Sequence, residues 1–341
     1  MIAEVIVDIS NSEVDRIFDY ACGDKTIQTG FRVLVPFGNR KIEGYVIGLK
    51  ESSDLSADKL KEIDSTLDDI PVIGEEMMQL AAYMKKRYHL RMVDALRLFI
   101  PAQMRGGRIK ELKRKLISVA DAFKETPADT FIPKRALAQR EVFDFVLAQG
   151  EVPLTDLNKE FSAAAVRNLI ERGVFVSKEY VARRTPYAGR IDTGKSVTLT
   201  PTQESVVNEV KNASGTVLLH GVTGSGKTEV YMRCIASALE KGKTAIMLEP
   251  EISLTPQVLK NFRARFGERV AILHSGLSAG ERFDEWQRLL CGEARVAVGA
   301  RSAIFAPLIN VGIIIIDEEH DASYVSDSNP RYSTLEVASF R

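Results

Sequence analysis

Short apolar stretches alternate with turn-forming positions along the first fifty residues. The stretches cover residues 3–9, 32–38 and 43–49, and Gly23 and Gly30 lie between them. Apolar residues of this length and spacing, separated by glycine and proline, are typical of short strands. The pattern therefore predicts a small β domain at the beginning of the chain.

A helical pattern follows over residues 74–98, and Pro101 marks its end. A spacing of three and four residues places one set of side chains on a single apolar face: Met77, Leu80, Ala81 and Met84. We assign this segment to the first domain, which we predict to span residues 1–104. The fold of that domain is expected to be barrel-like.

Residues 105–130 are polar and predict a linker. The first part, residues 105–115, carries six basic residues against one acidic residue. Such a tract either follows a DNA backbone or is a solvated linker.

Residues 131–184 contain three short helical segments and then a pair of strands, which predicts a winged helix. The third helix of that fold commonly enters a DNA groove. A winged helix that makes protein contacts or acts as a spacer is the alternative.

A second linker is predicted over residues 185–196, and the pattern changes again over residues 197–341. Helical segments there alternate with near-continuous aliphatic runs that begin near positions 217, 244, 270, 295 and 311. Such runs indicate strands buried on both faces of a parallel sheet. The fold class is therefore multidomain, with a β domain, a winged helix and an α/β lobe.

The composition, 45% hydrophobic and 27% charged, is that of a globular protein and excludes wholesale disorder. The net charge of +0 argues against a uniformly basic nucleic-acid binder but permits local patches. The sequence has no basic leader and no apolar run near the roughly 18 residues needed to span a bilayer, so we expect a cytoplasmic protein without membrane contact. Its three cysteines lack CxxC spacing, and we expect no zinc site in this chain.

Residues 221–228 match the pattern GxxxxGK[ST] between a predicted strand and a predicted helix. Glycines allow the backbone N–H groups and the following helix terminus to face phosphate oxygens. Lys227 would pair with the β and γ phosphates, and the Thr228 hydroxyl would hold Mg²⁺. The cofactors implied are ATP and Mg²⁺, and the expected nucleotide-binding residues are Gly221, Val222, Thr223, Gly224, Ser225, Gly226, Lys227 and Thr228.

An aliphatic run ends in two acids, Asp317 and Glu318. At the carboxyl end of a parallel strand, Asp317 can approach a metal ion beside the phosphates, and Glu318 can orient or deprotonate the attacking water. Alone, an acid pair at a strand end is usually a solvated loop start or a cap. Together with the glycine loop, it predicts ATP hydrolysis by Lys227, Asp317 and Glu318.

The sequence DEEH at residues 317–320 resembles the DExH box of superfamily 2 helicases. Residues 199–203 resemble the segment that reads adenine in such helicases, with Gln203 as the reader. A helix N-cap at Thr202 with an exposed glutamine is the alternative.

Two further segments follow in the order of that superfamily. Residues 249–257 resemble motif Ia and residues 298–303 resemble motif Ib, which lie against single-stranded DNA and grip its phosphates. Residues 197–341 as a whole resemble the replication-restart helicase family, called PriA or primosomal protein N-prime, which implies a RecA-like lobe. Residues 16–20 and 32–38 resemble the 3′-end DNA-binding domain of the same family.

The resemblance implies a pocket for the terminal nucleotide of a nascent leading strand, lined by Phe18, Asp19, Tyr20, Gly38 and Lys61. Without it, Phe18 and Tyr20 would be assigned to the core of a strand. Residues 324–332 occupy the place of the aromatic-rich loop that couples DNA to ATP hydrolysis, but Pro330 stands where a tryptophan is expected. The remaining expected DNA contacts are Pro250, Arg301, Ser302, Arg331 and Tyr332.

The resemblance implies an ATP-dependent 3′-to-5′ DNA helicase that recognises stalled or abandoned forks and initiates primosome assembly. Its implied partners are forked and single-stranded DNA, primosome proteins and single-stranded DNA-binding protein. We expect a fragment that binds DNA and nucleotide but unwinds poorly, because no second lobe with an arginine finger and no zinc module follow the DEEH box. The alternatives are a fork-binding scaffold with a vestigial nucleotide site and a superfamily 2 translocase of the RecG type.

Overall fold

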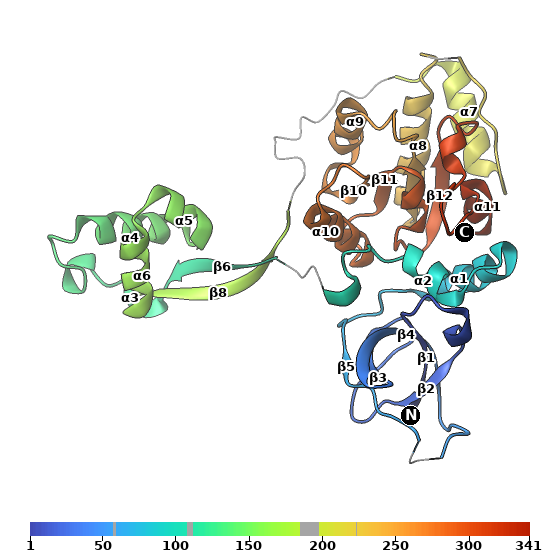
Figure 1. Cartoon of the computed structure of the whole chain (residues 1–341). Coiled ribbons are helices and arrows are strands. Elements are labelled where there is room, and N and C mark those ends of the chain that lie inside the picture. Colours follow the sequence, from blue (N-terminus) through green and yellow to red (C-terminus); the bar gives the residue numbers. More distant parts are fainter. Residues whose placement is uncertain (57–58, 108–111, 185–197, 223) are drawn as a thin grey trace. The chain divides into compact units, whose positions relative to one another are not determined.

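The computed structural model describes residues 1–56, 59–107, 112–184, 198–222 and 224–341. Two compact units account for them. The first combines Met1–Ile109 with Pro186–Arg341, and the second is Lys110–Thr185. Each unit is described separately below, and Figure 1 labels their helices and strands.

The first unit begins with an antiparallel sheet in the strand order β2-β1-β4-β3-β5. Its strands are β1 (Ile2–Val7), β2 (Phe18–Ala21), β3 (Arg32–Phe37), β4 (Arg40–Lys50) and β5 (Ser65–Thr66). The sheet curls, so that the Tyr20 hydroxyl of β2 reaches β3 and donates to the carbonyl oxygen of Pro36 at 3.2 Å. The rings of Phe18 and Phe37 also meet edge to face, with centroids 5.3 Å apart. Two strands that are not neighbours in the sheet are thereby brought together.

Two helices follow the curled sheet, where a single helical pattern was predicted over residues 74–98. Helix α1 (Glu75–Tyr88) ends at His89, which has a left-handed φ of 53°, and α2 (Met92–Leu98) begins three residues later. The predicted apolar face of α1 is fully buried. It belongs to a core that also contains Trp286, whose Nε1 donates to the carbonyl oxygen of Phe99 at 3.0 Å. The helices thus connect the curled sheet to the lobe that follows in the same unit.

That lobe contains a parallel sheet in the order β10-β11-β9-β12. Side chains of β9 alternate between two cores: Ala245 and Met247 pack with α8 and α9, whereas Ile246 and Leu248 pack with α10. Both faces of the sheet are therefore covered, as the aliphatic runs predicted. The elements are α7 (Pro201–Asn212), α8 (Lys227–Glu240), β9 (Thr244–Leu248), α9 (Pro256–Phe266), β10 (Val270–Leu273), α10 (Ala279–Leu290), β11 (Val296–Gly299), β12 (Val311–Ile316) and α11 (Thr334–Phe340).

One predicted strand of the lobe does not form. Residues 217–220 precede the glycine loop but pair with no strand, and Leu218 is 81% exposed. Strand β12 is therefore an edge of the sheet. Among the described helices of the whole chain, none has the length and apolar character needed to cross a membrane.

The second unit combines helices with an antiparallel sheet in the order β7-β6-β8. Its strands are β6 (Leu112–Val119), β7 (Glu151–Pro153) and β8 (Phe175–Ala182). Its helices are α3 (Asp121–Lys124), α4 (Leu137–Gln149), α5 (Leu154–Glu160) and α6 (Ala163–Glu171). The prediction of a linker over residues 105–130 is corrected, because β6 lies within it and buries Ile117 and Val119. The predicted strand pair near residues 174–184 is instead one strand, β8, paired with β6.

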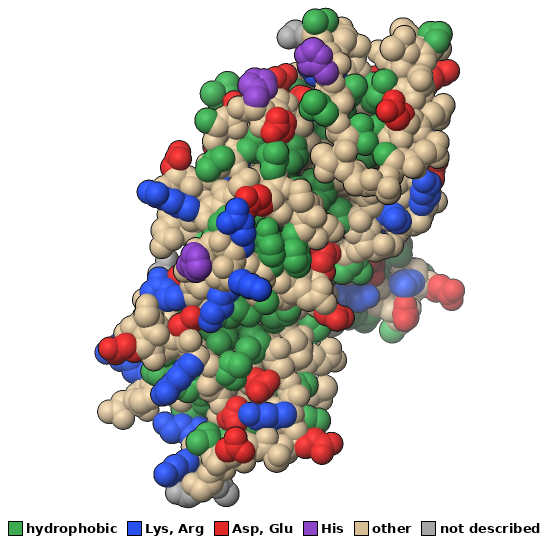
Figure 2. Space-filling model, turned by 90° about the vertical axis from the view of Figure 1, so that its right-hand side faces the viewer, with side chains coloured by type: hydrophobic (Ala, Val, Ile, Leu, Met, Phe, Trp, Pro, Cys, Tyr) green, Lys and Arg blue, Asp and Glu red, His purple; other side chains and the backbone are tan. Residues whose placement is uncertain are grey.

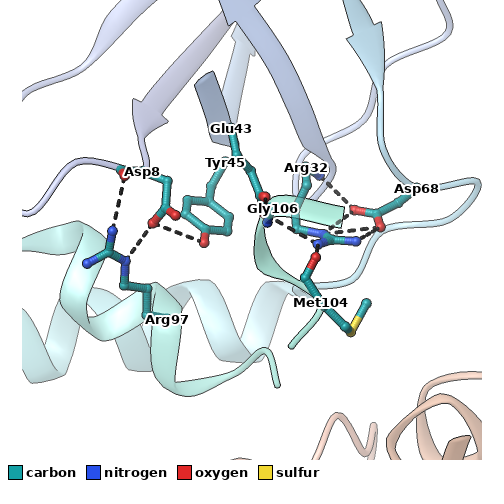
Figure 3. Close-up of polar contacts among 8 residues, drawn as sticks. All are labelled: Asp8, Arg32, Glu43, Tyr45, Asp68, Arg97, Met104 and Gly106. Carbon is teal, nitrogen blue, oxygen red and sulfur yellow. Dashed lines mark hydrogen bonds and ion pairs between the residues drawn. The ribbon is translucent and has the colours of Figure 1, made fainter. Parts of the chain in front are cut away.

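A buried network of charges fastens the curled sheet to the segment after α2 (Figure 3). The guanidinium of Arg32, which is 5% exposed, pairs with Asp68 through Nε at 3.0 Å and with Glu43 at 3.3 Å. It also donates to the carbonyl oxygen of Met104 at 3.0 Å, while Glu43 accepts from the backbone N–H of Gly106 at 2.9 Å. Removal of the cation would leave two buried carboxylates without their partner.

We predict that Arg32→Met lowers the free energy of unfolding of the first unit by about 3–5 kcal/mol, because the buried carboxylates of Asp68 and Glu43 would lose their cation. The measurement is urea unfolding followed by the fluorescence of Trp286, the one tryptophan of the sequence. Arg87→Met is the matched control. Its ion pair with Glu336 is exposed, so the free energy of unfolding should hardly change. Equal decreases in the free energy of unfolding of the two variants would show that the buried network does not stabilise the first unit more than an exposed ion pair does.

Candidate nucleotide-binding site and nucleic-acid interface

The glycine loop leads into α8, and its lysine lies near the acids at the end of β12. Lys227 Nζ donates to the carbonyl oxygen of Gly221 at 2.8 Å and lies 3.8 Å from Glu318 Oε1. Gly226 caps the helix with a φ of 83°, a conformation that favours glycine. Backbone N–H groups at such a helix terminus attract anions. Thr223, one of the predicted nucleotide-binding residues, lies outside the described residues, while Val222, Gly224, Ser225 and Thr228 are exposed.

Asp317 lies within a cluster of acids at the edge of the sheet. Its Oδ1 accepts from the Tyr231 hydroxyl at 2.9 Å, and its carboxylate contacts Glu249. Glu249 is 4% exposed. Burial, together with the charges of Asp317 and Glu318, raises the pKa of Glu249 to about 8. Three carboxyl groups are thus collected at this sheet edge, and burial favours the neutral form of Glu249.

Glu249 was not predicted at this site, because residues 249–257 were expected to contact DNA. It directly follows β9, just as Asp317 directly follows β12, and these strands are parallel neighbours. Carboxyl ends of parallel strands meet at one edge of a sheet. The position of Glu249 directly after a buried aliphatic run was the available signal.

The turn after β12 holds these acids in an uncommon conformation. Glu318 has a φ of 47°, and a left-handed residue with a side chain is disfavoured by about 1–2 kcal/mol. The buried Tyr324 hydroxyl donates to the carbonyl oxygen of Asp317 at 2.8 Å. This bond lies in the same turn from which the Glu318 carboxylate approaches Lys227.

The acids fit a magnesium ion that arrives with a nucleotide rather than a metal ion held by protein alone. Within the described part of the chain, no group of three or more His, Cys, Asp or Glu residues could hold a metal ion. Mg²⁺ commonly binds one or two carboxylates and completes its shell with water and phosphate oxygens. The crowding of Asp317 and Glu249 is the kind of charge that a divalent cation would relieve.

Gln203 lies at the start of α7, beside the glycine loop, and the alternative of an N-cap at Thr202 is wrong. Helix α7 is capped by Thr200 rather than Thr202, and Gln203 completes the capping box by accepting from the Thr200 N–H at 2.9 Å. Its Nε2 also donates to the carbonyl oxygen of Ser225 in the glycine loop at 3.0 Å. The side chain is therefore both part of the cap and a support for the loop.

A cavity of about 480 Å³ lies beside the motif Ib segment. Arg301, Ser302 and Tyr332 line it together, as do the residues that follow α2. Arg301 Nη1 donates to the carbonyl oxygens of Ser323 and Val325 at 3.0 and 2.7 Å, and its guanidinium faces the Tyr332 ring at 5.8 Å. Of the other expected DNA contacts, Pro250 is buried, Arg331 is exposed, and neither lines the cavity.

The expected terminal-nucleotide residues are only partly brought together. Phe18 and the buried Tyr20 lie on the core face of β2, next to the turn that contains Gly38. Asp19 points to the opposite face, where it pairs with Lys50 at 2.8 Å. Lys61 lies beside Ala21, at the other end of β2. Phe18 and Gly38 therefore form one group, and Asp19 and Lys61 lie apart from it.

No uniform charge covers the face shown in Figure 2. Lys and Arg side chains there are interspersed with Asp and Glu, and the blue side chains are more frequent over the lower half than over the upper half. Charges of both signs are thus mixed on this face. A nucleic-acid contact on it would depend on local groups of cations.

Comparison with known proteins assigns a class to the first unit. The family model described as "3'DNA-binding domain (3'BD)" matches residues 4–101, and the model described as "DEAD/DEAH box helicase" matches residues 200–336. The curled sheet with α1 and α2 is thus a 3′ DNA-binding domain. The parallel lobe, with Lys227 beside the acids of β12, is a helicase domain.

Relatives named "Replication restart protein PriA" match nearly the whole chain. The Bacillus subtilis protein is 36% identical, with 98% of this chain and 51% of the relative covered. The Synechocystis protein is 31% identical over 99% and 50%, and the Haemophilus influenzae protein is 33% identical over 95% and 45%. The chain belongs to the PriA family of replication restart proteins, which confirms the resemblance found in the sequence. It spans about half the length of these relatives.

A pair of glycines tests the contact between Gln203 and the loop. Gly224 and Gly226 both have a positive φ, so alanine is strained at either position, but only a Cβ at Gly226 would meet Gln203 Nε2, at 2.5 Å. We predict that Gly226→Ala weakens binding of a fluorescent ATP analogue at least tenfold more than Gly224→Ala does.

The loss at Gly226 should arise because Gln203 is displaced. In the Gly226→Ala background, Gln203→Ala should therefore cause little further loss of binding of the ATP analogue. In the Gly224→Ala background it should cause its full loss of binding. Additive effects in both backgrounds would show that the two residues act independently.

Proposed function

We propose that this chain supplies the DNA-end-binding and ATP-binding modules of an ATP-dependent 3′-to-5′ DNA helicase that recognises stalled forks and initiates primosome assembly. The observation that carries the proposal is the approach of Lys227 to Glu318, with Asp317 at the same sheet edge. A phosphate-binding lysine and an acid pair this close together suit a triphosphate that binds beside both of them. The matched 3′ DNA-binding domain supports a fork as the substrate.

The proposed roles at the sheet edge follow from the donors and acceptors present. Lys227 and the amides at the start of α8 bind the β and γ phosphates, with Lys227 exchanging the Gly221 carbonyl for a phosphate oxygen. Glu318 orients the attacking water and accepts its proton. Thr228 and Asp317 would hold Mg²⁺, which neutralises phosphate charge when bound. Gln203 would contact adenine from its place beside the loop.

The proposed DNA contacts follow the cavity and the curled sheet. Single-stranded DNA would pass Arg301, Ser302 and Tyr332, where an aromatic ring and a guanidinium can stack on bases. The terminal nucleotide would bind near Phe18 and Gly38 in a barrel-like domain, with Asp19 and Lys61 at its margins. We further propose that the second unit is a winged helix and that primosome proteins and single-stranded DNA-binding protein are partners of the complete cytoplasmic protein.

A fork whose nascent leading strand ends in a 3′-hydroxyl should bind more tightly, by about tenfold, than the same fork ending in a 3′-phosphate. A carboxylate that accepts from the hydroxyl would repel the phosphate, and a hydrogen bond to a charged group contributes about 1.5–3 kcal/mol. Fluorescence anisotropy with both forks is the measurement. Asp19→Asn should reduce the difference, whereas Asp64→Asn, which also breaks an ion pair of this domain, should preserve it. Equal affinities of the unaltered protein for both forks would contradict the proposal of a pocket for the terminal nucleotide.

The complete protein with Lys227→Ala should bind forks normally but lose ATP hydrolysis by 10³-fold or more, because the phosphate-binding cation is absent. Steady-state ATPase and restart assays measure this. A scaffold with a vestigial nucleotide site would keep its restart activity unchanged in this variant. A RecG-type translocase is disfavoured by the match of residues 4–101 to the 3′ DNA-binding domain.

A further inference from the structure

Charge is segregated within the second unit. Strands β6 and β8 pair over eight positions, from Leu112 opposite Ala182 to Val119 opposite Phe175 (Figure 1). Strand β7 pairs with β6 only over Leu116–Ser118, so the rest of the pair is a two-stranded ribbon. The cations of this ribbon are exposed, and Glu179 is its one acid. We call four of its residues the basic ribbon: Lys113, Arg114, Lys115 and Lys178.

The cations of the basic ribbon are available for an external partner. Within the described part of the chain, none of the four has a side-chain ion pair or hydrogen bond. Lys115 lies directly opposite Glu179, yet the two side chains form no ion pair. Tyr180 lies opposite Arg114 and adds an aromatic ring to the same stretch. Unpaired cations next to an aromatic ring are a common feature of nucleic-acid-binding surfaces.

The helices of the second unit have the opposite balance. Helices α4, α5 and α6 together carry three basic and five acidic residues. Of the basic residues, Arg140 pairs with Asp129, and Lys159 pairs with Asp156 at 2.9 Å. Helix α6, expected to enter a DNA groove, offers only Arg167 and Glu171 as charged residues. Phosphates would therefore be repelled by the helical side and attracted by the ribbon.

The arrangement of the cations favours a duplex groove over a flat strand. Directly opposed residues share one face of a ribbon. Lys113 and Lys115 thus share one face with Val181 and Glu179, while Arg114 and Lys178 lie on the other. Alternate residues are about 7 Å apart along a strand. The major groove admits a two-stranded ribbon and has phosphates along both walls, so it can engage cations on both faces.

We propose that the second unit binds duplex DNA through the basic ribbon, placed in a groove, and not through α6. The inference rests on the proposed function in taking DNA as the partner. The phosphates of a parental or nascent arm of the fork are the ligand. Contacts of this kind position the unit without sequence preference.

The test uses the full chain with Lys113→Gln, Arg114→Gln and Lys115→Gln combined. Anisotropy with a blunt duplex should show affinity reduced at least tenfold at 0.1 M salt. The slope of log affinity against log salt should fall by about two to three, since each lost phosphate contact removes roughly 0.9. A single strand of equal length should bind as before. The variant with Lys113→Arg, Arg114→Lys and Lys115→Arg keeps the charge and should bind like the unaltered chain, which guards against misfolding.

The matched control removes three cations from the helices, by Arg140→Gln, Lys159→Gln and Arg167→Gln combined. It should leave the duplex salt slope unchanged. A loss equal to or greater than that of the ribbon variant would assign the contact to the helices. A loss confined to single-stranded DNA would overturn the choice of duplex. The preference for a 3′-hydroxyl over a 3′-phosphate is measured in the same variants. It tests the end-binding pocket independently of the ribbon, because either proposal can be contradicted while the other still holds.

Discussion

Two parallel strands, β9 and β12, end side by side, and each continues directly into an acid. This adjacency places Glu249 against Asp317 and leaves Lys227 within 3.8 Å of Glu318. The carboxyl groups at this edge repel one another when charged. Burial and the neighbouring carboxylates raise the pKa of Glu249 to about 8. A carboxyl with a pKa this high is largely protonated near neutral pH, and a cation bound beside it would favour its charged form. The sheet edge is therefore suited to a ligand that carries both phosphates and a divalent ion.

The same turn leads from the sheet edge to the cavity. Tyr324 holds the carbonyl oxygen of Asp317, and the neighbouring carbonyls of Ser323 and Val325 accept from Arg301. Arg301 in turn faces Tyr332, which lines the cavity. The acids at the sheet edge and the residues that line the cavity are thus joined by contiguous contacts. Tyr332 and Arg301 make this path although Pro330 stands in place of the expected tryptophan.

The sequence predicted those features that depend on local pattern. The buried face of α1, the parallel strands β9 to β12 and the glycine loop before α8 each have a periodicity or motif of their own. Features that depend on distant pairing were missed. Strand β6 was assigned to a linker because its lysines and arginines outweigh its apolar residues in the sequence. Ile117 and Val119 become buried only when β6 pairs with β8, more than fifty residues later. The segment 217–220 has the apolar composition of a strand but forms no pair, since propensity does not guarantee a partner.

The pairing of β6 with β8 also changes how the basic tract should be interpreted. In a solvated linker, these cations would spread apart and lose entropy on binding a partner. In the ribbon they are held at strand spacing before any partner arrives, so less ordering is needed on binding. The net charge of the chain is zero, but the charge of the second unit is unevenly distributed. Its helices are acidic and its ribbon is basic, so only the ribbon side can approach a phosphate backbone. Charge placement of this kind can decide the orientation of a module on DNA even where no base is recognised.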